Sequence, residues 1–142
     1  SFFQMEYAMG SAIQSFPTAK AMIVPRSRFF PVKKTSDLLM LLSDLVHFDD
    51  HAQLTWDTNK SIHIECEPPF DTVDGFFEHF KCIPSLQLLE SLSIKGSVYF
   101  DHLMSLKGTV KIHLNDHDSF SIPSDLKTLE NVQYIDGQLT SL

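Results

Sequence analysis

The strongest candidate for chemistry is a basic segment in an otherwise acidic chain. Five of the 11 Lys and Arg residues fall between positions 20 and 34, and no Asp or Glu lies between Glu6 and Asp37. These five are Lys20, Arg26, Arg28, Lys33 and Lys34. Such a run of positive charge either covers a solvated surface or binds a small anion such as a phosphate group.

The position of Lys33 and Lys34 favours the phosphate interpretation. Thr35 or Ser36 is expected to cap a helix, with Asp37 in its first turn. A helix N-terminus presents unpaired backbone N–H groups and attracts anions, and two adjacent lysines strengthen that attraction. The chain has only 5 Gly and no Gly-rich nucleotide loop, so it does not hold a complete nucleotide site.

Histidine and cysteine give weaker candidates. Two histidine pairs are spaced by four residues among Asp residues, His47 with His51 and His113 with His117. Turn positions explain these pairs better than a structural metal, so no metal ligands are predicted. Cys66 and Cys82 form no CxxC motif; reduced thiols are favoured over a disulfide, and no catalytic signature surrounds either residue.

Apolar spacing predicts mixed elements in the first part of the chain. Helical periodicity runs from Met5 to Phe16 and over residues 38–46, whereas residues 21–24 read as a short buried strand. Residues 62–66 alternate like a strand. Residues 73–80 follow helical spacing, with Asp71 as the expected cap.

After Pro84 the sequence repeats at an interval of twelve residues. Residues 93–98 (SIKGSV) recur as 105–110 (SLKGTV), with a weaker copy at 134–139 (YIDGQL). Twelve is two hexapeptides, which favours a short parallel β-helix over ordinary antiparallel hairpins, the alternative. Its open end would invite self-association. The predicted core residues are Ile94, Val98, Leu106, Val110, Ile135 and Leu139.

Composition excludes several classes of protein. A net charge of -7 argues against a nucleic-acid or anionic-membrane binder. No apolar run is long enough to span a membrane, and the first residues do not resemble a signal peptide. The lack of an initiator Met predicts a piece of a longer chain, and reduced cysteines favour the cytoplasm.

Three adjoining strings carry a family resemblance: residues 24–29 (VPRSRF), 31–33 (PVK) and 35–39 (TSDLL). In this region the sequence closely resembles the UTP–glucose-1-phosphate uridylyltransferases, also called UDP-glucose pyrophosphorylases. The resemblance extends over nearly the whole chain, through residues 4–6, 10–16, 83–84, 92–100, 105–110 and 129–131. Lys34 departs from the family, which has a small residue or Thr there.

The resemblance implies an α+β fold. Residues 1–83 would be the end of the α/β nucleotidyltransferase domain, and residues 84–142 a short C-terminal parallel, left-handed β-helix that mediates homo-oligomer assembly. Lys33 would be the catalytic lysine that contacts substrate phosphates. Lys34, Arg26 and Arg28 would be further phosphate-binding residues.

The implied reaction transfers uridylyl from UTP to glucose-1-phosphate, with Mg²⁺ bridging the phosphates. The Mg²⁺ ligands and the uridine and glucose contacts would lie upstream, so the 142-residue chain alone is expected to be inactive. Two alternatives remain open. The parent could be a UDP-sugar or UDP-N-acetylglucosamine pyrophosphorylase, or the chain could be a non-catalytic, anion-binding assembly module.

Overall fold

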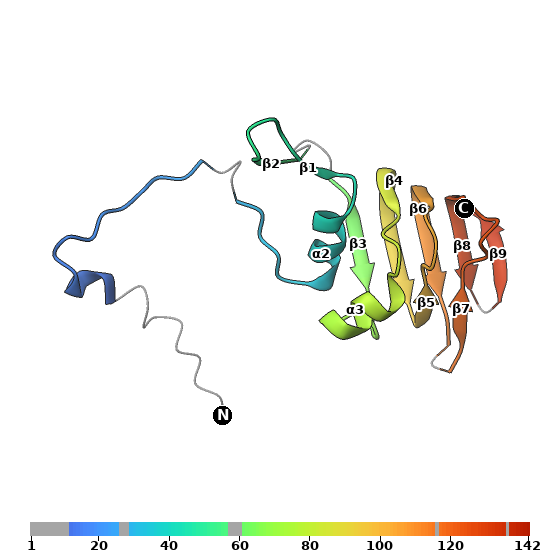
Figure 1. Ribbon diagram of the computed structural model, residues 1–142. Helices are drawn as coiled ribbons and strands as arrows, with labels where there is room; N and C mark the ends of the chain where they lie inside the picture. Colours follow the sequence, from blue (N-terminus) through green and yellow to red (C-terminus); the bar gives the residue numbers. More distant parts are fainter. Residues whose placement is uncertain (1–11, 26–28, 57–60, 116, 136) are drawn as a thin grey trace, which may run out of the picture.

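Strands with alternating aliphatic residues build the sheet that dominates the computed structural model (Figure 1). The structure describes residues 12–25, 29–56, 61–115, 117–135 and 137–142. The sheet order is β3-β4-β6-β8-β9. β3, β4, β6 and β8 run parallel, and β9 is antiparallel to β8. The bounds are β3 His63–Cys66, β4 Ser85–Lys95, β6 Ser105–His113, β8 Thr128–Ile135 and β9 Gln138–Ser141.

A second, smaller sheet faces this one. It pairs β5 Ser97–Tyr99 with β7 Ser119–Ser121, also in parallel. The chain turns from β4 into β5 at Gly96, whose φ of 84° suits a residue without a side chain. Two successive passes of the chain therefore contribute one strand to each sheet and stack as parallel coils. The fold is α+β and mostly sheet; its description as a left-handed β-helix stays a prediction.

The twelve-residue period predicted from the sequence is wrong as a description of the stacking. Ser85 pairs with Ser105 and Ser105 with Thr128, whereas Ser93 pairs with Lys111 rather than with Ser105. The two similar strings have different structural roles. In the first copy Gly96 makes the corner after β4, and in the second Gly108 lies within β6, where the pairing with β8 shifts by an irregularity.

The third copy is an antiparallel hairpin. β8 and β9 pair directly across Gly137, whose φ is 84°. This is the arrangement that the alternative interpretation gave for the repeats. Among the predicted core residues, Ile94, Val98, Leu106 and Val110 are fully buried. Ile135 and Leu139 were predicted wrongly, because the hairpin lies at the end of the sheet and leaves them 40% and 53% exposed.

Two helices lie beside the sheet, α2 Thr35–Leu42 and α3 Val73–His79. Both were predicted, but α2 ends at Leu42 rather than at Val46, which begins β1. The cap of α3 is Thr72 and not Asp71. The Thr72 backbone is extended immediately before the helix, so its hydroxyl accepts from the Gly75 N–H at 3.1 Å. Of the predicted apolar stripe, Phe76 and Phe80 are buried, whereas Val73 and Phe77 face outward and stay about half-exposed.

The N-terminal part of the chain departs most from expectation. Residues 21–24 form no strand; Met22 and Ile23 are 86% and 96% exposed. An apolar run becomes a buried strand only where a partner strand satisfies its backbone, and none of the described strands pairs with it. Most of the predicted first helix lies outside the described residues, which include a short 3₁₀ turn, η1 Ile13–Ser15.

The remaining two strands lie between α2 and β3 in the chain. β1 Val46–Phe48 and β2 Leu54–Trp56 form an antiparallel hairpin beyond α2. The division of the chain at residues 83 and 84 stays a prediction, and the main sheet crosses it because β3 pairs with β4. Within the described residues, no helix is both long and apolar enough to cross a membrane.

Candidate functional site

The two lysines singled out in the sequence lie together at the start of α2. Lys33 and Lys34 are exposed and line a cavity of about 440 Å³. We call this the lysine cavity; Thr35 and Ser36 extend its wall on the α2 side, and β3 supplies the facing wall. Two mobile cationic side chains beside a cavity can neutralise the charge of a bound phosphate group.

The local structure before α2 is fixed by Asp37. Its Oδ2 atom accepts hydrogen bonds from the backbone N–H groups of Lys33 at 2.8 Å and Lys34 at 2.9 Å. The predicted caps, Thr35 and Ser36, are therefore wrong: Lys34 occupies the N-cap position and the helix begins at Thr35. The Asp37 carboxylate uses the positive end of the helix itself, so the lysine side chains carry the attraction for an external anion.

Acidic residues complete the lysine cavity. Glu65, Glu67 and Asp71 line it from the β3 side. Glu67 also forms an exposed ion pair with Lys95, with Nζ and Oε2 3.6 Å apart. Sequence reasoning missed these carboxylates as site residues. The strand-like alternation of residues 62–66 is consistent with an outward-pointing Glu65. Only the packing of β3 beside α2, however, brings Glu65 opposite the lysines.

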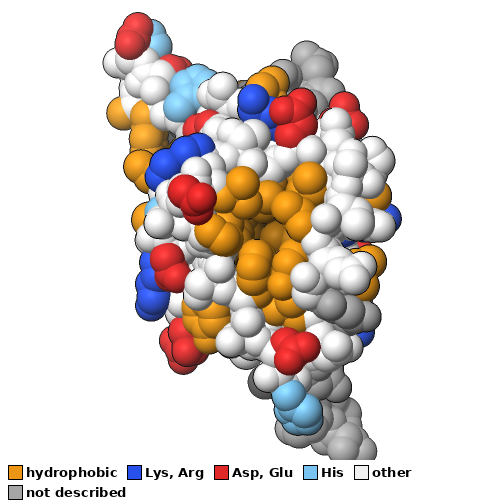
Figure 2. All heavy atoms as spheres, turned by 90° about the vertical axis from the view of Figure 1, so that its right-hand side faces the viewer, with side chains coloured by type: hydrophobic (Ala, Val, Ile, Leu, Met, Phe, Trp, Pro, Cys, Tyr) orange, Lys and Arg blue, Asp and Glu red, His pale blue; other side chains and the backbone are white. Residues whose placement is uncertain are grey.

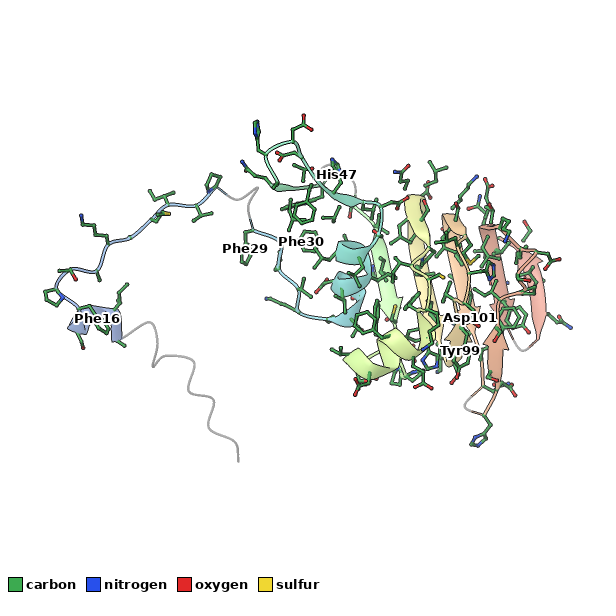
Figure 3. The ribbon with its side chains drawn as sticks, in the orientation of Figure 1. Phe16, Phe29, Phe30, His47, Tyr99 and Asp101 are labelled. Atoms are coloured by element: carbon green, nitrogen blue, oxygen red, sulfur yellow. The ribbon has the colours of Figure 1, made fainter. Side chains whose placement is uncertain are left out.

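The approach to α2 is anchored by an aromatic contact. The Phe30 ring meets the Trp56 ring edge-on, with centroids 5.1 Å apart. Phe29 and Phe30 point to opposite sides of the strand-like segment that leads into α2 (Figure 3). Arg26 and Arg28, predicted to bind phosphate, lie outside the described residues.

Cys66 also lines the lysine cavity, and its side chain is partly buried. Burial, with a smaller contribution from the charge of Glu65, raises its pKa to about 12. The thiol therefore stays protonated at neutral pH and is a poor nucleophile. Both Cys66 and Cys82 are free, as the preferred interpretation of the sequence predicted.

The histidine pairs divide between two settings. His51 lies in the turn after β1, where Asp49 accepts from its backbone N–H at 2.8 Å, as the turn interpretation predicted. For His47 that interpretation is wrong, because this residue lies within β1. His113 instead ends strand β6, and its Nε2 lies 2.8 Å from the Ser93 hydroxyl. In the described part of the chain, no three His, Cys, Asp or Glu side chains are grouped as metal ligands.

Comparison with known proteins gives one consistent answer. A family described as UTP–glucose-1-phosphate uridylyltransferase matches residues 1–107. The chain is 43% identical over 133 residues to the enzyme of that name from Musa acuminata, covering 90% of this chain and 28% of that protein. It is 40% identical over 124 residues to the one from Solanum tuberosum, covering 84% and 26%.

Solved structures agree in fold. A mutant UDP-glucose pyrophosphorylase from Leishmania major matches with a TM-score of 0.72 and 33% identity, over 90% of this chain and 27% of that one. A protein from Trypanosoma brucei matches with a TM-score of 0.71 and 33% identity, over 89% and 29%.

These relatives are, by their names, nucleotidyltransferases. The chain belongs to the UTP–glucose-1-phosphate uridylyltransferase family, because the family match covers most of its length. It spans just over a quarter of the length of the curated relatives.

Proposed function

We propose that this chain is the C-terminal part of an enzyme that transfers uridylyl from UTP to glucose-1-phosphate, releasing UDP-glucose and pyrophosphate. The observation that carries the proposal is the family match over residues 1–107, a span that includes the lysine cavity. One solved relative from Leishmania major, 32% identical, is described in complex with UDP-glucose.

Lys33 is the residue to which we assign a catalytic role. Uridylyl transfer requires the sugar phosphate to attack the α-phosphorus of UTP in line, with positioning and charge neutralisation as the main demands on the protein. The hydrogen bond from the Lys33 N–H to Asp37 fixes the backbone from which its side chain extends at the lysine cavity. Lys34, Arg26 and Arg28 belong to the same proposal as phosphate-binding residues.

The metal and the other ligands remain proposals from the family. Mg²⁺ would supply charge neutralisation at the phosphates, with protein ligands outside this chain. UTP and glucose-1-phosphate would bind mainly to the upstream part of the parent. A cytoplasmic location is a further proposal, supported by the two free cysteines.

The test is pyrophosphate release from UTP and glucose-1-phosphate by the full-length parent. Lys33→Ala should lower kcat by roughly 10²–10³, the scale of removing one preorganised donor. Lys34→Ala is the matched control and should cost much less. A reversed order would move the catalytic role to Lys34. Equal turnover with another sugar phosphate would favour a UDP-sugar pyrophosphorylase, and turnover by the 142-residue chain alone would contradict the expected need for upstream residues.

We also propose that the C-terminal end of the stack binds a second copy of the chain. A hollow of about 220 Å³ opens there, lined by apolar side chains that include Ile112, Phe120, Leu126, Leu129, Tyr134 and Leu139. Figure 2 shows apolar atoms gathered around this hollow, with charged side chains toward the rim. Next to it runs β9, the last strand of the sheet, which contains no charged residue to protect its edge.

Light scattering across a dilution series tests this assembly. We expect the chain to self-associate, and Leu139→Asp to weaken the association because it places a charge in the apolar hollow. Leu103→Asp is the control, since Leu103 is 74% exposed and does not line the hollow. A strict monomer at high concentration, or an equal effect of the two substitutions, would contradict the proposal.

A further inference from the structure

One carboxylate joins the end of α2 to the first long strand of the stack. Asp44 lies two residues beyond the helix, and its Oδ2 accepts a hydrogen bond from the Ser85 hydroxyl at 2.5 Å. Its Oδ1 accepts from the backbone N–H of Leu86 at 2.9 Å. Leu86 is fully buried in the core, so Asp44 fastens the helix end to a rigid part of the molecule.

The burial of α2 is deepest in its middle. Leu39 is its one fully buried residue, Leu38 beside it packs partly buried against the core, and Leu42, in its last turn, is 43% exposed. The two adjacent leucines act as a pivot, about which a helix can tilt. Leu39 lies four residues from the start of α2, about 6 Å along the helix axis, so a tilt of about 10° about it would move the lysine-bearing end by roughly 1 Å.

We propose that Asp44 is a positioning residue for Lys33. Resting on the role proposed above for Lys33, the inference is that the hydrogen bonds to Ser85 and Leu86 fix the second point of α2 and hence where the Lys33 ammonium lies. Displacements of about 1 Å in a phosphoryl-transfer site can cost up to roughly 10²-fold in rate. Asp44 is not a catalytic residue, because it lies at the opposite end of the helix from the lysine cavity.

Different substitutions of Asp44 and Ser85 remove or keep the two hydrogen bonds, and so serve as controls for one another. Asp44→Ala removes both acceptors. Asp44→Asn keeps the shape and can satisfy both partners, because its amide oxygen accepts from the Leu86 N–H and its NH₂ group donates to the Ser85 hydroxyl. Ser85→Ala removes one hydrogen bond and leaves the other. Asp101→Ala is the matched surface control, since the Asp101 backbone carbonyl, which accepts from Cys82 Sγ, is kept in this variant.

The experiment measures kcat and KM of the full-length parent in single variants and in the Lys33→Ala background. We expect Asp44→Ala to lower kcat about 10-fold with little change in KM. Ser85→Ala should lower it less, and Asp44→Asn should restore it. In the Lys33→Ala background, Asp44→Ala should cause no further loss, since there is no ammonium left to misplace.

Several results would overturn this role for Asp44. They are an unchanged kcat in Asp44→Ala, a loss that Asn does not rescue, or an equal loss with and without Lys33. If Asp44→Ala does not fold, Ser85→Ala carries the same comparison. If Lys33→Ala itself leaves kcat unchanged, the proposed role of Lys33 fails and the inference falls with it. A loss in Lys33→Ala but none in Asp44→Ala refutes the inference alone.

Discussion

Gly108 offers the sharpest test of how the stacked coils hold together. Its φ is 59°, a conformation that side-chain-bearing residues rarely adopt. A Cβ at this position would overlap Oδ1 of Asn131 and lie 2.8 Å from its Cγ. That same Oδ1 accepts a hydrogen bond from the Thr109 N–H at 3.0 Å, which ties β6 to β8 where their pairing is irregular.

Gly108→Ala should therefore lose two kinds of stability. The left-handed backbone costs an Ala about 1–2 kcal/mol. Displacing the Asn131 amide would break a hydrogen bond worth about 1 kcal/mol. We expect the free energy of unfolding to fall by about 2–3 kcal/mol, measured by urea unfolding of the chain and followed by circular dichroism.

Gly137→Ala is the matched control for Gly108→Ala. Gly137 also has a positive φ, 84°, but a Cβ there would meet nothing within 4 Å. It should cost only the backbone part, about 1–2 kcal/mol. Adding Gly108→Ala to Asn131→Gly should also cost only that part, because the amide is already gone. Equal losses in Gly108→Ala and Gly137→Ala would refute the role given to Asn131.

Three further results are expected. Gly75→Ala should destabilise by about 1–3 kcal/mol although Ala normally favours helices, because its Cβ would overlap the Pro69 carbonyl oxygen; thermal unfolding measures it, and a gain in stability would contradict it. In a Cys82→Ser background, Cys66 should be alkylated at pH 8 far more slowly in the native chain than in urea, because its raised pKa leaves little thiolate; equal rates would argue against burial. Asp37→Ala should destabilise by about 1–2 kcal/mol and Asp37→Asn by less, since one amide oxygen can accept both hydrogen bonds made to Oδ2; equal losses in urea unfolding would place the effect in the charge.

Elements whose pattern reflects their own packing could be predicted from the sequence. Leu39 and Phe76 lie on predicted helix faces and are buried, and the strand expected at residues 62–66 is β3. The parallel stacking of β4, β6 and β8 also followed from the sequence, although for a partly mistaken reason. Aliphatic residues beside a Gly indicate a strand that bends, and such strands do stack here.

The interval between similar strings did not give the length of a coil. Gly96 and Gly108 both need a positive φ, so similar residues surround them, yet one makes a corner and the other an irregularity within a strand. A repeat of only six residues cannot distinguish a glycine at a corner from a glycine at an irregularity within a strand. The pairing of Ser85 with Ser105 depends instead on how many residues each corner and loop consumes, which sequence similarity does not record.

The candidate site was predicted on one side only. Lys33 and Lys34 stood out because they are consecutive and precede a helix, which is local information. The carboxylates that face them come from β3 and from the loop before α3, about 30 residues further on. No local pattern ties such residues to a lysine pair, because their proximity arises from the packing of α2 beside β3.

The lysine cavity contains both positive and negative side chains, which gives a reason why the chain alone should bind a phosphate group weakly. Glu65, Glu67 and Asp71 oppose the two lysines, and Asp37 already occupies the amides before α2. A free anion therefore gains little from entering the lysine cavity, where attraction to the ammonium groups is offset by repulsion from the carboxylates. On the proposed function, a triphosphate held by residues upstream of this chain would instead present its charge to Lys33 at a fixed distance from those carboxylates. The same arrangement would disfavour unproductive binding of inorganic phosphate, so the lysines would act on a substrate that other residues have already positioned.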